Sequence, residues 1–416
     1  MSGASGQRPR KNPLLRTHVP LTPPAARSRI ALRLTAAAAR GRFELQVCRR
    51  CAHVQYPPRE ACERCLGLEL DWKAERGAGE LLAETTLHHS HEEYFRLRLP
   101  CRIGLVRLES GPTLVTFLRA GARGVGSRVL VAAHLDRAGQ AVLVARAVGE
   151  QDSMAEDRAL RELTCSARQR KILVTDGKSA TGQALIRGLL QTGAELVWAG
   201  TAEPWKAAPG LDELARDPRV TPVPLDLTDS DSVRERVAQI GAKVDILINN
   251  AELHRPYGIG ARYGVEVARA EMDLNYFGLL RLAQELAPVM RARSADAPAS
   301  AVAWVNILSI YALSSFPAQG TFSASKAAAY SLSQCLRAEL QRSGVRVMHV
   351  FPGPLDESWN EQLPGPKLSP EALARSVLGA LEEGIEDVYP GDLAQEWLAR
   401  WREDPKVLER ELAAGG

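Results

Sequence analysis

The feature that most limits the fold is a regular alternation of apolar runs and helical segments that begins at residue 171. Six short runs are rich in apolar residues: "KILVTD", "ELVWAG", "VTPVPLD", "VDILINN", "AVAWVNILS" and "RVMHVFPG". The segments between them carry apolar residues at helical spacing. Apolar strands separated by helices are typical of a parallel sheet that is covered on both faces. We therefore predict an α/β fold, a Rossmann-type doubly wound parallel sheet, over residues 171–416.

A different pattern precedes this region. Five apolar or alternating runs are separated by Gly and Pro: "GELLAETTL", "CRIGLVRLES", "TLVTFLRA", "SRVLVAAHL" and "AVLVARAV". Five such runs within about 70 residues predict a small OB-like antiparallel β-barrel over residues 77–149. An Ala-, Leu- and Arg-rich segment over 25–44 predicts a helix before it. The remaining parts are predicted as a disordered arm over 1–24 and a charged linker or short helix over 150–170.

The cysteines indicate a metal site. Two C-x2-C pairs, ten residues apart, hold four of the seven cysteines: Cys48, Cys51, Cys62 and Cys65. Each pair aims two thiolates at one point, and two pairs complete a tetrahedral four-sulfur site. We predict a structural zinc ribbon over 25–76, in which the metal stabilises a module too small for a core of its own. Iron in the same cage, or two redox dithiols, is the alternative. Cys101, Cys165 and Cys335 are predicted to be small buried apolar residues.

Charge is distributed unevenly along the 416 residues, whose formal net charge is +4. Residues 1–150 carry 24 Lys and Arg against 13 Asp and Glu, whereas residues 151–416 carry 29 against 36. A basic front favours an anionic ligand or partner, such as nucleic acid, a coenzyme A phosphate or an acidic protein surface. No run is long and apolar enough for a membrane helix, and the N-terminus lacks the apolar core of a secretory signal. We therefore expect a cytoplasmic protein.

The front of the chain resembles a known family. "CRRCAHVQYPPREACERC", "GAGELLAETTL" and "PCRIGLVRLESGPTLVTFL" are similar to the acyl-CoA-associated OB-fold family with its rubredoxin-like zinc ribbon, over roughly residues 25–148. The resemblance implies a small partner that binds a thiolase-like enzyme or an acyl-CoA thioester. Nucleic-acid binding is the competing interpretation, and it requires aromatic platforms on which bases stack. The barrel offers few aromatic residues, namely Tyr94, Phe95 and Phe117.

From residue 171 to about 400 the chain resembles the short-chain dehydrogenase/reductase family. The matching pieces are "VTDGKSATGQAL", "LDLTD", "ILINNAE", "LNYFG", "VNILSIYA", "FSASKAAAY" and "VFPGPLDES". The resemblance assigns catalytic positions to Ser309, Lys326 and Asn275, and it places Phe322 where the family has a tyrosine. That tyrosine exchanges a proton with the substrate, and the lysine lowers its pKa. A phenyl ring has no such proton, although a positioned general acid contributes roughly 10²–10⁴ in rate. Tyr311 or Tyr330 could substitute.

The resemblance also assigns cofactor positions: Thr175, Lys178, Gly182, Asp226, Asn249, Asn250, Lys326, Pro352 and Gly353. Several neighbouring positions depart from the family. The three glycines of its phosphate turn are here Asp176, Ala180 and Gly182. A carboxylate at Asp176 would face an anionic pyrophosphate unless Lys178 offsets it. Glu252 replaces the glycine after "NNA", and "VWAGTAE" lacks a residue that grips the adenosine ribose. We expect NAD(P) binding to be weakened or lost.

These observations lead to three hypotheses. In the first, the chain is an accessory or scaffold subunit of an acyl-CoA-processing complex. Its ribbon and barrel dock on a thiolase-like enzyme or acyl-CoA. Its degenerate reductase domain forms a homo- or hetero-oligomer, in which it pairs with itself or with an active reductase subunit. In the second, it is an active NAD(P)-dependent reductase of a β-keto- or β-hydroxyacyl-CoA. In the third, it binds nucleic acid.

Overall fold

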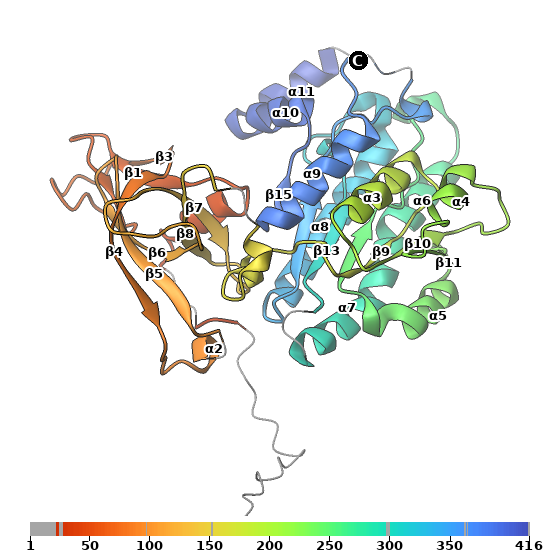
Figure 1. The fold of residues 1–416 in the computed structure, drawn as a ribbon. Helices are drawn as coiled ribbons and strands as arrows, with labels where there is room; N and C mark the ends of the chain where they lie inside the picture. The colour runs from red at the N-terminus through yellow and green to blue at the C-terminus, as the bar shows by residue number, and fades with distance from the viewer. Residues whose placement is uncertain are drawn as a thin grey trace, which may run out of the picture.

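The computed structural model of the protein describes residues 22–24, 28–96, 98–150, 153–296, 300–361, 363 and 365–414. Most of the arm predicted over 1–24 lies outside these residues. Figure 1 shows a smaller β-rich part, built from the first third of the chain, beside a larger part in which helices surround a sheet. Among the helices of the described residues, none combines the length and the apolar character that crossing a bilayer requires.

The cysteine-bearing region forms a three-stranded antiparallel sheet in the order β2-β1-β3. Its elements are helix α1 (Leu32–Ala38) and strands β1 (Glu44–Cys48), β2 (Val54–Gln55) and β3 (Leu70–Ala74). The helix is shorter than the segment predicted over 25–44. Leu34 and Ala38 on α1 and Leu45 on β1 belong to the same apolar cluster as the barrel interior. The ribbon and the barrel therefore share one core.

The next five strands form a closed barrel in the order β4-β5-β6-β8-β7. They are β4 (Ala78–Leu87), β5 (Cys101–Leu108), β6 (Thr113–Leu118), β7 (Arg128–Leu135) and β8 (Ala141–Ala147), with the short helix α2 (Glu93–Arg96) between β4 and β5. Each strand lies on one of the five predicted runs. Inward-facing residues such as Leu81, Val106 and Leu114 alternate with exposed ones, as expected for strands with one solvated face. The predicted barrel is confirmed, but it is not antiparallel throughout, because β6 pairs with β8 in parallel.

The C-terminal part contains a seven-stranded parallel sheet in the order β11-β10-β9-β12-β13-β14-β15. Its strands are β9 (Lys171–Val174), β10 (Leu196–Thr201), β11 (Val220–Pro224), β12 (Ile246–Asn249), β13 (Ala303–Ile307), β14 (Arg346–Val350) and β15 (Asp387–Val388). The first six lie on the six predicted runs. The seventh was not predicted, because a two-residue strand leaves no periodic signal. The Rossmann-type prediction is confirmed.

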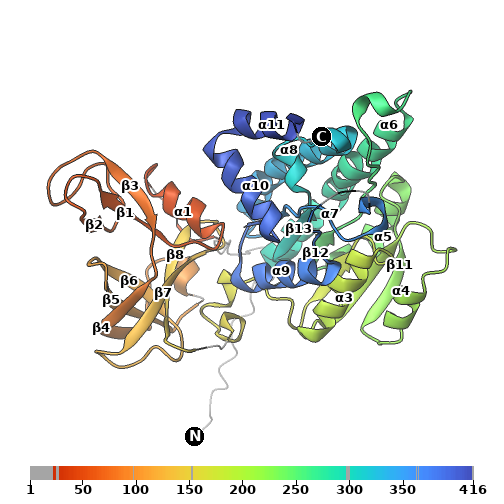
Figure 2. The same ribbon diagram turned by 90° about the horizontal axis from the view of Figure 1, so that it is seen from above.

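Helices cover both faces of this sheet (Figure 2). One apolar cluster lies under α3 and α9, and the other lies under α5, α7 and α8. The α-helices of this part are α3 (Ala180–Gln191), α4 (Pro209–Leu214), α5 (Ser230–Ile240), α6 (Glu266–Met272), α7 (Leu279–Asp296), α8 (Gly320–Gln341), α9 (Pro370–Glu383), α10 (Asp392–Glu403) and α11 (Pro405–Ala414). A π-helical turn over Asp273–Gly278 joins α6 to α7. The sheet therefore lies between two layers of helices. Folds of this kind bind ligands at the carboxyl ends of the strands.

Hydrogen bonds join the barrel part to the α/β part. The carbonyl oxygen of Ala39, just after α1, accepts from the backbone N–H of Glu386 (2.8 Å) and of Asp387 (3.0 Å). The side chain of Gln341 on α8 donates to the carbonyl oxygen of Ala138 in the β7–β8 turn, at 2.8 Å. The segment predicted as a linker packs in the same region, and it buries Met154, Leu160 and Leu163 against the barrel residue Val144.

Candidate functional site

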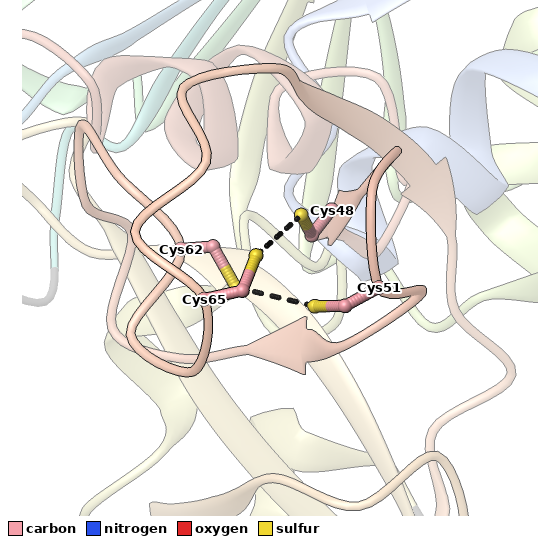
Figure 3. A group of neighbouring side chains, drawn as sticks. All are labelled: Cys48, Cys51, Cys62 and Cys65. Carbon is pink, nitrogen blue, oxygen red and sulfur yellow. Dashed lines mark hydrogen bonds between the residues drawn. The ribbon is translucent and has the colours of Figure 1, made fainter.

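The four paired cysteines come together on the ribbon (Figure 3). Their sulfur atoms all lie within 4.8 Å of one another. Cys48 Sγ is 3.6 Å from Cys65 Sγ, and Cys51 Sγ is 3.6 Å from Cys62 Sγ. A tetrahedral zinc site with Zn–S bonds of about 2.3 Å places its sulfurs about 3.8 Å apart, whereas a disulfide needs about 2.05 Å. The cluster therefore fits a four-thiolate zinc site, in which all four positions would be held by protein.

The backbone of the two cysteine turns repeats the same geometry. Ala52 and Leu66, each directly after the second cysteine of its pair, adopt the left-handed conformation with φ of 57° and 59°. Their N–H groups donate to the carbonyl oxygens of Cys48 and Cys62, both at 2.9 Å. Although burial acts in the opposite direction, backbone N–H groups of the second turn lower the pKa of Cys62 to about 6. In the first turn, a backbone N–H acts to lower the pKa of Cys51, but burial and the neighbouring thiols raise it to about 12. Both turns thus aim the thiols at one point, and the second turn favours the thiolate form of Cys62.

The other three cysteines take no part in this cluster. Cys101 and Cys165 are buried, as predicted. Cys335 is exposed on α8, so the prediction of a buried side chain was wrong there. The reason is its place on the helix: Ser333 and Leu336 take the inward-facing positions on either side of it, which leaves Cys335 on the outer face.

Phe322 lies buried near the start of α8, at the position where the family has its tyrosine. Its ring stacks on the imidazole of His254, with 3.8 Å between centroids and 14° between planes. Phe322 is 3% exposed and His254, in the loop after β12, is 6% exposed. Burial lowers the pKa of His254 to about 4, so its ring is neutral near pH 7. The stack covers one face of the phenyl ring, and Phe322 has no hydroxyl with which to exchange a proton.

The ammonium group of Lys326 is bound by the protein itself. Its Nζ lies 2.7 Å from Glu252 Oε2 and donates to the carbonyl oxygen of Ile307 at 3.1 Å. The lysine side chain is 3% exposed. A buried ammonium needs a compensating charge, and Glu252 supplies it from the position where the family has a glycine. The replacement of the family's glycine by Glu252 is therefore matched by an ion pair with Lys326.

Asn275 and Ser309 are buried and hold backbone in place. Asn275 accepts from the N–H of Leu253 and donates to the carbonyl oxygen of the same residue, both at 2.9 Å, and it donates to Ser325 Oγ at 2.8 Å. Ser309 Oγ accepts from the N–H of Tyr311 at 3.2 Å and begins a short 3₁₀ turn. These bonds support the loop after β12 and the turn after β13. A catalytic role for these two residues and Lys326 stays a prediction.

An internal carboxylate occupies the turn from β9 into α3. Asp176 Oδ1 accepts from the backbone N–H of Lys178 (2.9 Å) and of Ser179 (3.4 Å). Ser179 caps α3 by accepting from the N–H of Gly182 at 3.1 Å. N–H groups at the start of a helix are the groups that bind phosphate in dinucleotide-binding folds. Burial raises the pKa of the Asp176 carboxyl. Two donors of this turn are therefore already satisfied by an anion from the chain.

Lys178 does not offset this carboxylate by an ion pair. Its Nζ donates to the carbonyl oxygens of Glu203 and of Lys206, the latter at 2.8 Å. These carbonyls lie in the loop after β10, where the family grips the adenosine ribose. Among the described residues, no ion pair joins Lys178 to Asp176. The lysine instead ties two loops together across this end of the sheet.

Several predicted cofactor residues brace the same turn. Asn250 donates to the carbonyl oxygen of Asp176 at 2.7 Å and accepts from its N–H at 3.0 Å. Thr175 Oγ1 donates to Asn249 Oδ1 at 3.1 Å. A Cβ atom at Gly182 would lie 1.8 Å from the carbonyl oxygen of Asp176, so only glycine fits there. The glycine of the turn that remains is thus required by the fold itself.

The other predicted cofactor positions lie after β11 and β14. Asp226 Oδ1 accepts from the N–H of Thr228 at 2.8 Å. Pro352 and Gly353 are buried in the loop after β14, and the carbonyl oxygen of Pro352 accepts from the N–H of Ile310 at 2.9 Å. The fold brings these residues to the carboxyl ends of the strands together with Thr175 and the asparagines. Their contact with a cofactor stays a prediction.

Sequence reasoning missed two residues of this region, His254 and Glu357. Thr181 Oγ1 donates to Glu357 Oε1 at 2.8 Å. Burial raises the pKa of the Glu357 carboxyl, and the charges of Glu252 and Asp176 add to the effect. Three carboxyl groups therefore influence one another where an anionic dinucleotide would bind. The signal available was position in the sequence, since His254 follows the piece "ILINNAE" by two residues and Glu357 lies within the piece "VFPGPLDES".

Among the described residues, no hydrogen bond joins either candidate substitute for the tyrosine to Lys326, whose polar partners are Glu252 and Ile307. The ring of Tyr311 stacks on Phe316, with 5.3 Å between centroids. The ring of Tyr330 packs edge-on against Phe351, with 5.1 Å between centroids. Burial raises the pKa of both hydroxyls. Both tyrosines are engaged in aromatic packing, so nothing in their surroundings favours a role in proton transfer.

The aromatic residues of the barrel are not available as a platform for bases. Tyr94 is buried and donates to Glu162 Oε2 at 2.9 Å. Phe95 packs edge-on against Tyr94. Phe117 packs against the buried cluster that contains Met154. Base stacking requires exposed rings along a groove. The geometry of the barrel therefore gives no support to the nucleic-acid interpretation.

The strand order and the turn from β9 into α3 define a Rossmann-type dinucleotide-binding fold, here attached to a four-cysteine ribbon and a barrel. Family comparison divides the chain in the same way. A short chain dehydrogenase family matches residues 170–365, a ChsH2 rubredoxin-like zinc ribbon domain matches residues 35–71, and a ChsH2 C-terminal OB-fold domain matches residues 72–134. The chain belongs to the short-chain dehydrogenase family through its C-terminal domain, which is fused to ChsH2-type zinc ribbon and OB-fold domains.

Relatives of the C-terminal domain confirm this assignment. An uncharacterized oxidoreductase of Staphylococcus aureus strain USA300 is 30% identical over 217 residues, which are 51% of this chain and 90% of the relative. A short chain dehydrogenase from Burkholderia cenocepacia, solved in complex with NADP, is 34% identical with a TM-score of 0.53, covering 59% of this chain and 98% of that one. A short-chain dehydrogenase from Streptomyces avermitilis is 26% identical with a TM-score of 0.50, covering 59% and 97%.

Proposed function

We propose that this protein is an accessory subunit of an acyl-CoA-processing complex and that its reductase domain is a scaffold with little or no catalytic activity. The ribbon and barrel dock on a thiolase-like enzyme or hold its acyl-CoA, and the reductase domain forms an oligomer with itself or with an active reductase subunit. The match of residues 35–134 to ChsH2-type domains supports the first part. The geometry of the reductase site supports the second.

The observation that carries the proposal is that the chain's own groups occupy three functional positions. Asp176 accepts from N–H groups of the phosphate turn, Glu252 pairs with Lys326, and His254 stacks on Phe322. To bind here, a dinucleotide would have to displace the Asp176 carboxylate from the N–H groups of the turn. The two negative charges of its pyrophosphate would then lie close to that carboxylate. Proton transfer would still lack its hydroxyl. Binding and chemistry are therefore both disfavoured, by different residues.

Titration of the purified full chain with NADH and NADPH tests the scaffold role. We expect no binding up to millimolar concentration, measured by nucleotide fluorescence and by calorimetry. The Burkholderia relative that was solved with NADP, or another active reductase, serves as the positive control under the same conditions. Micromolar binding to this chain, or steady oxidation of NADPH with a β-ketoacyl-CoA, would contradict the proposal.

Co-expression with thiolase-fold proteins encoded beside this chain tests the docking role. We expect a stable complex that survives size-exclusion chromatography. The matched control is Cys62→Ser, which removes one thiolate of the ribbon and should abolish the complex if docking uses the zinc ribbon. A wild-type chain that elutes alone in every pairing would count against the proposal.

The runner-up is an active NAD(P)-dependent reductase of a β-keto- or β-hydroxyacyl-CoA. It is favoured by the 34% identity to a dehydrogenase that was solved with NADP, and by the presence of Ser309, Lys326 and Asn275 at the family positions. In this case binding must open the Lys326–Glu252 pair, and another group must supply the proton. The cofactor titration separates the two functions directly.

A further inference from the structure

A cavity lies at the junction of the barrel and the α/β domain, away from the reductase site. Its volume is about 240 Å³. The walls come from the β7–β8 turn, the segment over 161–170, the C-terminal half of α8 and the start of β14. These elements surround the amino ends of the central strands, whereas Asp176, Lys326 and the other reductase positions lie at the carboxyl ends. The cavity is thus a separate feature of the fused chain.

Five guanidinium groups line this cavity: Arg137, Arg161, Arg170, Arg337 and Arg346. Three acidic residues also line it, namely Asp136, Glu162 and Glu386. Burial lowers the pKa of Arg137 and of Arg170, which reflects the cost of removing their charges from water. The lining therefore carries more positive than negative groups in a place where charge is expensive to bury.

Two of the acidic residues form long ion pairs with lining arginines, Glu162 with Arg137 at 3.9 Å and Glu386 with Arg337 at 3.8 Å, but each acidic residue also has other demands on its charge. Glu162 accepts two bonds from Arg98, at 2.6 and 2.8 Å, and Arg98 is not part of the lining. Asp136 Oδ1 accepts from the backbone N–H groups of Ala138 and Gln140 and tightens the β7–β8 turn. Burial raises the pKa of the Glu386 carboxyl, which favours its neutral form.

Arg346 is the most informative of the five cations. It is 8% exposed, and its guanidinium donates to the carbonyl oxygens of Leu135 (2.9 Å), Asp136 (3.3 Å) and Leu163 (3.2 Å). It forms no ion pair with any carboxylate in the described ranges. Carbonyl oxygens satisfy its N–H groups but do not neutralise its charge. The charge of Arg346 acts on the nearby Glu386 carboxyl, but burial raises the pKa of that carboxyl and favours its neutral form, so Arg346 is only partly compensated. An anion in the adjoining cavity would reduce the cost of burying this cation.

Arg161 lies at the exposed side of the same cavity. Its side chain is exposed and makes no hydrogen bond or ion pair to another part of the chain that the structure describes. Arginine recognises oxyanions through paired N–H donors, and it does so better than lysine because its fork matches their geometry. Arg346 inside and Arg161 outside therefore present guanidinium groups to one enclosed space.

From this arrangement we propose that the junction cavity binds a phosphate group, either inorganic phosphate or the phosphate of a larger molecule that extends past Arg161. The volume favours a small group, because pockets for whole small molecules are about 300–1,000 Å³. Its walls come from both parts of the chain, so the bound anion stabilises the junction between barrel and α/β domain. This inference does not depend on the scaffold role proposed above.

Thermal unfolding of the full chain in phosphate, compared with chloride at equal ionic strength, tests the proposal. A ligand that binds only the folded state raises the unfolding temperature, and above its Kd this rise grows with the logarithm of the ligand concentration. We expect a phosphate-specific rise, and we expect Arg161→Ala to weaken the apparent affinity roughly tenfold or more, because it removes a charged donor. Calorimetry gives the affinities directly. Arg161 is chosen because it makes no bond that the fold needs.

Arg158→Ala is the matched control, since Arg158 is exposed on the same segment but does not line the cavity. It should bind phosphate as the wild type does. No phosphate-specific rise at millimolar concentration, or equal weakening by the two variants, would overturn the proposal. Coenzyme A and its form without the 3′-phosphate distinguish the sources. Binding of coenzyme A that is tighter than that of inorganic phosphate, and that depends on Arg161 and on the 3′-phosphate, identifies a phosphate carried by a larger ligand. Binding of inorganic phosphate that is at least as tight as that of either coenzyme form identifies free phosphate.

Discussion

The cysteine cluster and the reductase site differ in how completely the side chains that each family uses are present in this chain. In the ribbon, all four ligands are present, and their sulfur atoms lie within 4.8 Å of one another, as a tetrahedral metal requires. In the reductase domain, the strands and the loops that carry the site are intact, but charged and aromatic residues of the chain itself fill the functional positions.

The difference shows which demands each site must meet. A structural zinc site contributes to folding, so losing one thiolate unfolds the module that depends on it. At the reductase site, hydrogen bonds and an ion pair within the chain hold the loops in place. Substitutions there are tolerated if new partners satisfy the buried groups, as Glu252 does for Lys326. Under the scaffold role proposed above, the fold of the second domain persists without the chemistry of its family.

The largest effect is expected at the metal cluster. Cys62→Ser removes one of four thiolates, and structural zinc contributes on the order of 10 kcal/mol in small zinc modules. We expect loss of bound zinc, measured by elemental analysis, and early unfolding of the ribbon. Cys335→Ser is the control, because Cys335 is exposed and outside the cluster. Full zinc content in Cys62→Ser would show that the cysteines do not form one site.

Restoring the family residues at the reductase site tests whether the altered residues are what prevents cofactor binding. The triple variant Asp176→Gly, Glu252→Gly and Phe322→Tyr removes both carboxylates and returns the hydroxyl. We expect NADPH binding to improve from beyond millimolar to micromolar, about a thousandfold. Tyrosine should then add roughly 10²–10⁴ in rate over the same variant with Phe322 retained.

The single variant Asp176→Asn separates two effects at the phosphate turn. It keeps an oxygen that accepts from the N–H groups of Lys178 and Ser179 but removes the charge. Improved binding by this variant identifies charge as the obstacle, whereas improvement only with glycine identifies occupation of the donors. If the triple variant binds NADPH no better than the wild type, the groups described here do not block the site.

The buried ion pair makes the next prediction. Glu252→Gln leaves the ammonium of Lys326 buried without its counter-charge, and we expect a loss of about 3 kcal/mol in the free energy of unfolding. Glu371→Gln breaks an exposed pair with Arg187 and should cost less than about 1 kcal/mol. Denaturant unfolding of both variants gives the comparison. Equal, small losses would mean that the Lys326–Glu252 pair does not hold the site closed.

The smallest expected effect concerns pH. The pKa of His254 is about 4 in the folded chain, below its ordinary value of 6.5, so the unfolded chain binds more protons between these values. Its stabilising contribution is complete above about pH 6.5 and is lost as the pH falls toward 4. Between about pH 7 and pH 4.5 the wild type should lose about 2–3 kcal/mol more than His254→Phe, which keeps the stack. Parallel pH profiles of the two proteins would contradict burial of a neutral imidazole.

Local signals in the sequence were enough for the architecture. Six apolar runs coincide with β9 to β14, because parallel buried strands are apolar along their whole length. The sequence did not predict the strand β15, because two residues, which pair with β14 at the edge of the sheet, are too few to show a period. The spacing of the cysteines likewise predicted the cluster, because two residues between ligands fix the turn that aims them at one metal.

The sequence also revealed that the reductase motif is altered, at Asp176, Glu252 and Phe322, but not what those residues do. Glu252 pairs with Lys326, and His254 stacks on Phe322. The two members of each pair are about 70 residues apart in the sequence, and they meet because α8 packs against the loop after β12. The junction cavity is likewise lined by segments from both parts of the chain. Periodicity and ligand spacing act over a few residues, so sequence alone determines them. Pairing of charges and rings depends on which surfaces meet, and the tertiary structure decides that.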